Sequence, residues 1–118
     1  MKVPLYLCFL DLSKAFDTVP RELLFQKLLD LGVSGKMFRV IVDLFSQNSA
    51  KVFVNGYFTR DFSINRGVLQ GSKLGPILFN IFINDLLDKL NSGEFGALLD
   101  NIRISELGLA DDIVLISD

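Results

Sequence analysis

An unbroken run of apolar residues opens the chain, from Val3 to Leu10, and it ends at Asp11. Continuous apolarity over this length is typical of a strand that is buried on both faces of a sheet. The run is much shorter than the roughly 20 residues that a membrane-spanning helix requires, and no small-residue cleavage site follows it. We therefore expect a buried strand and no membrane contact, in an intracellular protein of the cytoplasm or the nucleus.

Three helices and a hairpin are expected next. Leucines at helical spacing follow Pro20 and stop at Gly32, and a second helix begins near Ser34. Asn55-Gly56 lies between two β-rich runs and predicts a two-residue hairpin turn with positive φ at both central residues. Pro76 opens a third helix that ends near Leu90. The apolar stripe of the second helix is predicted at Met37, Val40, Ile41, Leu44 and Phe45, and that of the third at Ile77, Leu78, Ile81, Phe82 and Leu86.

The last part of the chain favours strands again. Residues 91–101 show no regular pattern, whereas 102–105 and 107–118 are apolar and strand-like, with Asp111-Asp112 at a bend. The order strand, two helices, hairpin, helix, hairpin predicts an α+β or an α/β sandwich in which helices pack on one face of a sheet. The 118 residues fit a single domain.

Composition excludes several kinds of chemistry. The chain has no histidine, which removes His-dependent triads and His-ligated zinc, and Cys8 is its only cysteine, which removes internal disulfides. Catalysis would depend on its 14 acidic residues, its hydroxyls, its amines or its backbone. A net charge of −2 means that polynucleotide binding would need a local basic surface or a partner domain.

The acids at the two strand ends are the first candidate site. Asp11 ends one apolar run, and Asp111-Asp112 interrupts another, where carboxylates are costly unless a cation offsets their charge. If the two strands are neighbours, these oxygens suit Mg²⁺ or Mn²⁺, and carboxylates holding two such ions perform in-line phosphoryl transfer. Two alternatives are a polar hairpin turn at Asp111-Asp112 and a capping role for Asp11.

The glycine-rich loop from Asn65 to Gly75 is the second candidate site. Glycines allow a ligand to approach the backbone closely, and the loop leads into a helix N-terminus, which favours anions. Arg66 and Lys73 are suited to phosphate and Gln70 to a sugar or base, although the glycine spacing is not that of a P-loop. The alternative is a loop that only connects two elements.

Three stretches, in order, resemble the catalytic motifs of reverse transcriptases of the non-LTR (LINE-type) retrotransposons. They are Phe9–Val19, which contains Asp11 and the sequence Ala15-Phe16-Asp17; Gly67–Phe79, which contains Gln70-Gly71; and Leu109-Ala110-Asp111-Asp112. The third motif usually begins with an aromatic residue, and Leu109 departs from that pattern. Such a departure affects the positioning of the primer end rather than the acids.

The resemblance implies a polymerase palm, an α+β fold with helices packed on one face of an antiparallel sheet, and it assigns roles to the residues of the motifs. Asp11 and Asp111 would hold two Mg²⁺ or Mn²⁺ ions, and Asp112 would support them. Without the resemblance, Phe16 is predicted to be a core residue; with it, Phe16 would also exclude a 2′-hydroxyl. The nucleotide site would comprise Ser13, Lys14, Ala15, Phe16, Gln70 and Gly71, and the template and primer would contact Lys73, Pro76, Leu109 and Ala110.

By this resemblance, residues 1–118 form a partial reverse transcriptase domain, the palm, without the fingers and thumb. The expected partners are an RNA or DNA template with its primer, a dNTP, and the missing fingers and thumb segments of a polyprotein. Two other hypotheses remain: a decayed or repurposed fragment that serves as a binding module, and an RNA-copying polymerase, which the barrier at Phe16 disfavours.

Overall fold

The computed structural model describes residues 4–91 and 95–118, and the predicted class, α+β with antiparallel strands, is confirmed. Val3 and residues 92–94, on which parts of the expected first strand and irregular stretch fall, lie outside the described residues. In chain order the elements are β1 (Tyr6–Asp11), α1 (Ala15–Thr18), α2 (Arg21–Asp30), α3 (Gly35–Ser46), β2 (Ser49–Ala50), β3 (Phe53–Val54), β4 (Tyr57–Phe58), β5 (Phe62–Ser63), α4 (Leu74–Asn91), β6 (Ala97–Leu99), β7 (Ile102–Ile104), β8 (Glu106–Leu109) and β9 (Asp112–Ser117).

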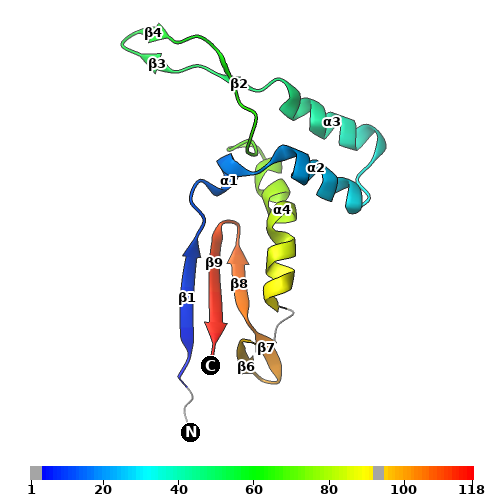
Figure 1. Ribbon diagram of the computed structural model, residues 1–118, viewed down its shortest axis with the longest axis vertical. Coiled ribbons are helices and arrows are strands. Elements are labelled where there is room, and N and C mark those ends of the chain that lie inside the picture. Colours follow the sequence, from blue (N-terminus) through cyan, green and yellow to red (C-terminus); the bar gives the residue numbers. More distant parts are fainter. Residues whose placement is uncertain (1–3, 92–94) are drawn as a thin grey trace.

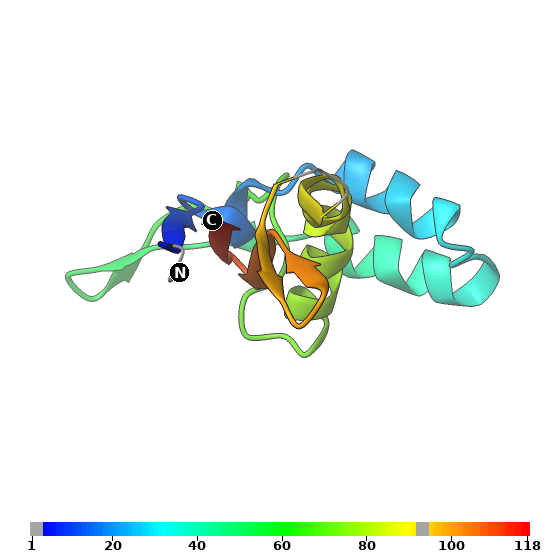
Figure 2. The same cartoon turned by 90° about the horizontal axis from the view of Figure 1, so that it is seen from below.

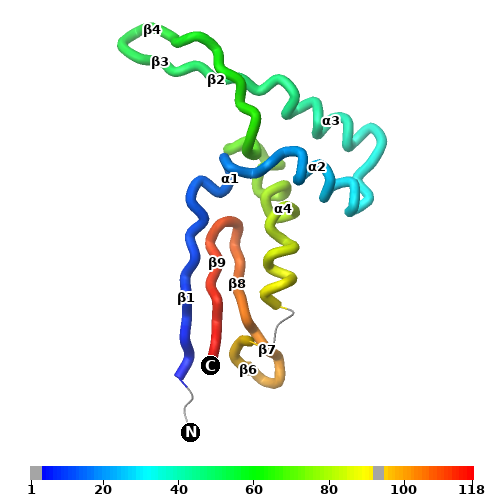
Figure 3. The backbone as a smooth tube through the Cα atoms, in the orientation of Figure 1, coloured from blue at the N-terminus to red at the C-terminus, as the bar shows by residue number. Residues whose placement is uncertain are grey.

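The main sheet brings the two ends of the chain together. Its order is β1-β9-β8, and both neighbouring pairs are antiparallel. The register of β1 with β9 runs from Tyr6 opposite Ser117 to Asp11 opposite Asp112. Consequently the C-terminal end of β1 and the β8–β9 turn lie at one end of the sheet, while β9 finishes at the other (Figure 1, and as a tube in Figure 3).

Helix α4 connects the sheet to the other helices. It runs beside β8, where the Leu87 side chain lies over Gly108. The buried Ser105 hydroxyl donates a hydrogen bond to the Leu90 carbonyl at 3.0 Å and so ties the start of β8 to the end of α4. In the described part of the chain, no helix is long and apolar enough to cross a membrane.

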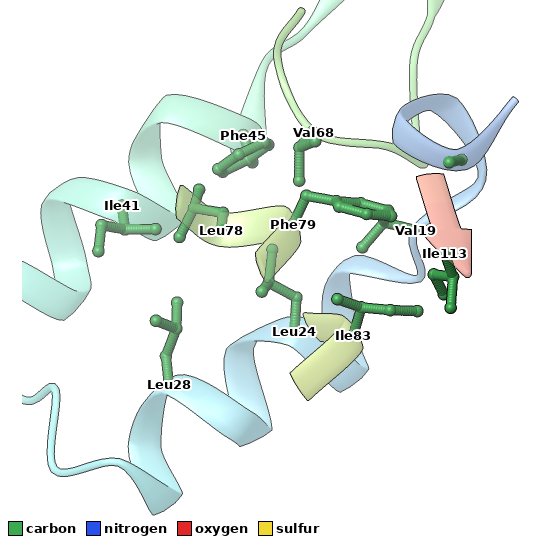
Figure 4. Close-up of a cluster of buried hydrophobic side chains, with 11 residues drawn as sticks. Val19, Leu24, Leu28, Ile41, Phe45, Val68, Leu78, Phe79, Ile83 and Ile113 are labelled. Carbon is green, nitrogen blue, oxygen red and sulfur yellow. The ribbon is translucent and has the colours of Figure 1, made fainter. Parts of the chain in front are cut away.

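The hydrophobic core lies at the helical end of the molecule, between α2, α3, the N-terminal half of α4 and the residues around α1 (Figure 4). The sheet contributes one fully buried side chain to it, Ile113. The buried apolar residues are Ala15, Val19, Leu24, Leu28, Ile41, Phe45, Val68, Leu78, Phe79, Ile83 and Ile113. Lys27 joins α2 to α4 at the edge of this core, because its ammonium pairs with Asp85 at 2.8 Å.

The prediction that the first strand is buried on both faces is wrong. Every residue of β1 is exposed, Tyr6 by 64% and Phe9 by 75%. The reason is its position: β1 is the edge strand farthest from α4, whereas the helix runs beside β8, and it is Ile113 of β9 that packs into the core. An apolar sequence predicts that a strand has to be covered, but it does not show which polypeptide provides the cover.

The predicted hairpin turn is confirmed, since Asn55 and Gly56 have φ values of 49° and 86°. Strands β3 and β4 pair around it, and β2 and β5 pair at its base. The hairpin extends away from the body on the side opposite α2 and α3 (Figures 1 and 2). Phe53 and Phe58 form a cross-strand aromatic pair, with ring centroids 4.8 Å apart, yet both are more than half exposed.

Several local expectations need correction. The stripe predicted for α3 is buried only at Ile41 and Phe45, because one face of this helix packs on α2 and the rest is exposed. Helix α4 begins at Leu74, two residues before Pro76, which sits in its first turn. The exposed members of the predicted stripes are Met37, Val40, Leu44, Ile77 and Leu86.

Residues 97–101, expected to be irregular, form β6 and the turn of a second hairpin, whose other strand, β7, falls in the predicted strand at 102–105. Its turn places Asp100 and Asn101 at φ values of 47° and 71°. Asp and Asn tolerate this conformation better than most residues, so the pair is a turn signal that the sequence analysis missed.

The arrangement of these elements is open. The radius of gyration is 18.9 Å, against about 13.5 Å for a compact domain of this length. The exposed surface is 9171 Å², whereas a compact monomer of this mass exposes about 6,400 Å². Much of the excess is apolar and lies on β1, on the outer face of the sheet and on the β3–β4 hairpin.

Candidate active site

The acids of the first candidate site meet at one end of the main sheet. Asp11 is the last residue of β1 and lies directly opposite Asp112, the first residue of β9. Leu109 of β8 is the other cross-strand partner of Asp112, so the three residues form one transverse row on the same face. Asp111 lies in the two-residue turn between Leu109 and Asp112. Residues that are a hundred positions apart in the sequence are therefore neighbours.

Among the described residues, no cationic side chain pairs with these carboxylates. Within residues 4–91 and 95–118, no side chain forms an ion pair or a side-chain hydrogen bond with Asp11, Asp111 or Asp112. A hollow of about 360 Å³ opens beside Asp11 and Asp112, with apolar walls from the two strands. Like charges placed directly across a strand pair repel each other, so the arrangement favours a bound cation.

The residues fit a divalent ion in their chemistry, although they do not form a closed cage. Across the described ranges, no three acidic or cysteine side chains converge closely enough to enclose a metal. Mg²⁺ is commonly held by only one or two carboxylates, with water and substrate phosphates completing its shell. Hard carboxylate oxygens at an open end of a sheet match that mode of binding.

Backbone strain marks the same place. Among the described residues, five that are not glycine have positive φ, and three of these are Asn or Asp in hairpin turns. The other two are Lys14 (φ 53°), in the turn after Asp11, and Ala110 (φ 56°), which precedes Asp111 in the β8–β9 turn. A left-handed conformation costs such residues roughly 1–2 kcal/mol, and strain of this kind is common at functional sites.

The turn after Asp11 is held by its own backbone and by the core. The Ala15 amide donates to the Leu12 carbonyl at 3.1 Å, and the Asp17 amide donates to the Lys14 carbonyl at 2.9 Å. Phe16 is half-buried and stacks on Phe79 of α4, with ring centroids 4.6 Å apart. Ser13 and Lys14 are left exposed at the tip of this turn.

The glycine-rich loop lies against this turn. The Gly67 amide donates to the Val19 carbonyl at 2.9 Å, and the Val68 amide donates to the Phe16 carbonyl at 2.8 Å. Gly67 has a φ of 83°, and a Cβ atom there would come within 2.8 Å of the backbone of Phe16 and Asp17. Only glycine fits, so this residue allows the two candidate sites to join.

Beyond Gly67 the loop presents its polar residues to solvent. The Gln70 amide donates to the Asp17 carboxylate at 2.7 Å, a contact that the sequence analysis did not anticipate. At the start of α4, the Gly75 amide donates a hydrogen bond to the Ser72 hydroxyl at 2.9 Å. The other predicted residues of this loop, Gly71, Lys73 and Pro76, are exposed.

The turn after Asp11 and the glycine-rich loop are therefore in contact, and α1, the start of α4 and the β8–β9 turn lie toward the same end of the sheet (Figure 1). Leu109 is 79% exposed next to Asp112, which together with Asp11 and Asp111 we call the acid row. This antiparallel sheet with helices packed beside it agrees with the palm-like α+β fold that the motifs predicted.

Comparison with known proteins places the chain in a family. The model described as reverse transcriptase (RNA-dependent DNA polymerase) matches residues 2–118. The retrovirus-related Pol polyprotein of the type-1 element R2 from Popillia japonica is 34% identical over 92% of this chain. That of the type-2 element R2DM from Drosophila melanogaster is 32% identical over 96%. The RNA-directed DNA polymerase of the mobile element jockey from Drosophila funebris is 37% identical over 67%.

The chain belongs to the reverse transcriptase family, and its relatives include non-LTR elements, as the motifs predicted. It spans only a small part of these relatives: 18% of the Popillia japonica polyprotein, 11% of the R2DM polyprotein and 8% of the jockey polymerase.

Proposed function

We propose that this chain is the palm of an RNA-directed DNA polymerase. In the reaction, the 3′-hydroxyl of a primer attacks the α-phosphate of a dNTP. A new phosphodiester bond forms, the bond to the β-phosphate breaks, and pyrophosphate leaves, while the hydroxyl proton passes to solvent. The observation that carries the proposal is the opposition of Asp11 and Asp112, with Asp111 beside them and no protein cation among the described residues.

The acids supply the metal-binding part of this proposal. Asp11 and Asp111 would hold the ions, and Asp112 would add negative charge that strengthens their binding. When bound, two divalent ions would lower the pKa of the attacking hydroxyl and neutralise charge on the leaving oxygen. The hollow beside Asp11 leaves room for the reacting groups. This chemistry requires no histidine, in agreement with the composition.

The two loops hold the substrates in this proposal. Backbone amides of Ser13, Lys14 and Ala15 bind the triphosphate, and Gln70 and Gly71 contact the nucleotide. Phe16 excludes a ribose 2′-hydroxyl, since stacking on Phe79 limits its freedom to move aside. Template and primer pass Lys73 and Pro76 at the start of α4 and Leu109 and Ala110 at the β8–β9 turn, all of which except the half-buried Ala110 are exposed.

The proposal includes partners outside these residues, namely template and primer, dNTP, and the fingers and thumb of a polyprotein. The open shape supports this, because an apolar surface of this extent is typical of an interaction site. We therefore expect residues 1–118 alone to show little or no primer extension.

The direct test replaces the matching segment of an active reverse transcriptase with residues 2–118 of this chain. We call the product the exchanged enzyme, and the parent enzyme is its positive control. We expect the exchanged enzyme to extend a DNA primer on RNA. Asp11→Asn and Asp111→Asn should each lower kcat at least about a hundredfold. Asp43→Asn, an exposed acid of α3, serves as the matched control and should keep full activity. Activity that survives Asp11→Asn would contradict the proposal.

A second candidate function, a binding module derived from a retroelement, is favoured by the same exposed apolar surface. The exchange experiment separates the two functions. A well-folded exchanged enzyme with no synthesis, and with no Mn²⁺ binding that depends on Asp11, would support the binding module.

A further inference from the structure

Arg21, the first residue of α2, makes an unusual set of contacts that the proposed function does not use. Its half-buried guanidinium donates to four backbone carbonyls that come from two separate segments. Nε donates to Gly67 at 3.0 Å, Nη1 to Ile64 at 2.7 Å and to Phe45 at 2.9 Å, and Nη2 to Arg66 at 3.1 Å. The guanidinium carbon also lies 5.0 Å from the centroid of the Phe45 ring.

Three of these carbonyls belong to the segment that enters the glycine-rich loop, 64–67. At the end of this segment, the amide of Gly67 donates to the Val19 carbonyl, and the amide of the next residue, Val68, donates to the Phe16 carbonyl. Carbonyls on one side and amides on the other thus fix the same short segment. Gln70 follows two residues after Val68, and its side chain is held by Asp17.

The geometry of the guanidinium explains why arginine occupies this position. A planar group with five donors can reach several carbonyls at fixed angles, whereas an ammonium is a single point donor. The four acceptors are neutral, so the arrangement depends on the shape of the donor group more than on its charge. Lysine at the same place would leave some of these carbonyls without a partner.

We propose that Arg21 is a positioning residue for the nucleotide site: it holds residues 64–67 so that Gln70 and Gly71 stand beside the turn at Phe16. This inference rests on the proposed function for its catalytic consequence. Loss of the guanidinium would let the loop move away from the turn, and displacement of a substrate-positioning group weakens substrate capture more than it changes the chemical step.

The first experiment measures hydrogen exchange in the 118-residue chain and requires no polymerase activity. In Arg21→Gln, the amides of Gly67 and Val68 should exchange at least about tenfold faster, since their bonds open more often. The amide of Ile83, in the core of α4, should keep its protection and so report that the fold persists. Arg39→Gln is the matched control, because Arg39 donates to a single carbonyl at 3.4 Å.

If Arg21→Gln unfolds the chain, Arg21→Lys takes its place, because it keeps the aliphatic stem and the charge. Faster exchange at Gly67 and Val68 in Arg21→Lys would support the inference, since charge without the fork would then be insufficient. Unchanged exchange at these two amides in a folded variant would overturn it, whatever the polymerase assays give.

The second experiment uses the exchanged enzyme described above. Arg21→Gln should raise the KM for dNTP about tenfold while kcat stays within about threefold, and Arg21→Lys should not restore the KM. A fall in kcat at constant KM, or full rescue by lysine, would overturn the positioning role. If the exchanged enzyme without further substitutions made no DNA, that result would count against the proposed function. The hydrogen-exchange rates of Gly67 and Val68 would then decide by themselves whether Arg21 positions the loop.

Discussion

The helical end of the molecule and its main sheet are built in different ways. Of the eleven buried apolar residues in the described part of the chain, ten come from the helices, the turn at α1 and the loop before α4, and the sheet contributes Ile113. In β1 every residue is exposed although its sequence is almost wholly apolar. The helical end is stabilised by its own packing, while the sheet is held by its ladder of backbone bonds and by contact with α4.

This difference separates two tasks. The helical end fixes the positions of the turn at Phe16 and the loop at Gly67, and both rest on Phe79 and its neighbours. The sheet brings Asp11 and Asp112 together through register alone. The apolar side chains of β1 remain exposed.

The largest expected difference in stability is between a Phe→Ala substitution at the helical end and one in the sheet. Phe79→Ala removes a side chain that is 1% exposed, and it should lower the free energy of unfolding by about 3–5 kcal/mol. Phe9→Ala, at a residue that is 75% exposed, should change it by no more than about 0.5 kcal/mol. Urea denaturation of the two variants measures the difference. Equal losses would show that the outer face of the sheet is buried in solution.

A second pair of variants tests the junction between the two ends. In Gly67→Ala the added methyl group meets the backbone of Phe16 and Asp17. Strain and overpacking together should cost about 3 kcal/mol. Gly71 has a similar φ but open space around it, so Gly71→Ala should cost only about 1 kcal/mol of strain. Thermal unfolding compares the two, and an equal cost would remove the close approach as the reason for glycine at position 67.

The acid row should reduce the stability of the sheet when no metal is present. Because Asp11 and Asp112 are like charges on opposed residues, Asp11→Asn should raise the free energy of unfolding by roughly 0.2–1 kcal/mol in metal-free buffer. The gain should shrink in 1 M salt, and Asp43→Asn should show no such gain. A loss of stability in Asp11→Asn would mean that the carboxylate already has a favourable partner.

The smallest effect concerns the helical end at low pH. The hydrogen bond and charge of Lys27 lower the pKa of Asp85 below its ordinary value. The carboxylate therefore contributes stability above the pKa that it has in the unfolded chain, and this contribution is lost as the pH falls through the lower folded value. Asp85→Asn should flatten the decline in stability between about pH 4 and pH 2. An unchanged slope in acid unfolding curves would contradict the ion pair.

The sequence predicted the elements whose signals are local. Asn55-Gly56 predicted its turn, and Gly32 and Ser34 marked the ends of two helices, because such residues act through their own backbone conformation. The sequence also indicated that the strand ending at Asp11 and the strand beside Asp111-Asp112 could be neighbours, and the register places Asp112 rather than Asp111 directly opposite Asp11. Arg21 could not be predicted from the sequence, because its four partners are backbone carbonyls and carry no residue signature. The exposure of β1 was mispredicted because apolar sequence reports a need for cover and not its source.

Titration of the 118-residue chain with Mn²⁺, followed by NMR, tests most directly whether acids from both ends of the sequence bind the same ions. Paramagnetic broadening should appear at the amides of Asp11 and Asp111 at the same Mn²⁺ concentration. It should be lost from both segments in Asp11→Asn and kept in Asp43→Asn. Broadening at Asp111 that persists unchanged in Asp11→Asn would show two independent sites and would contradict a shared metal-binding centre.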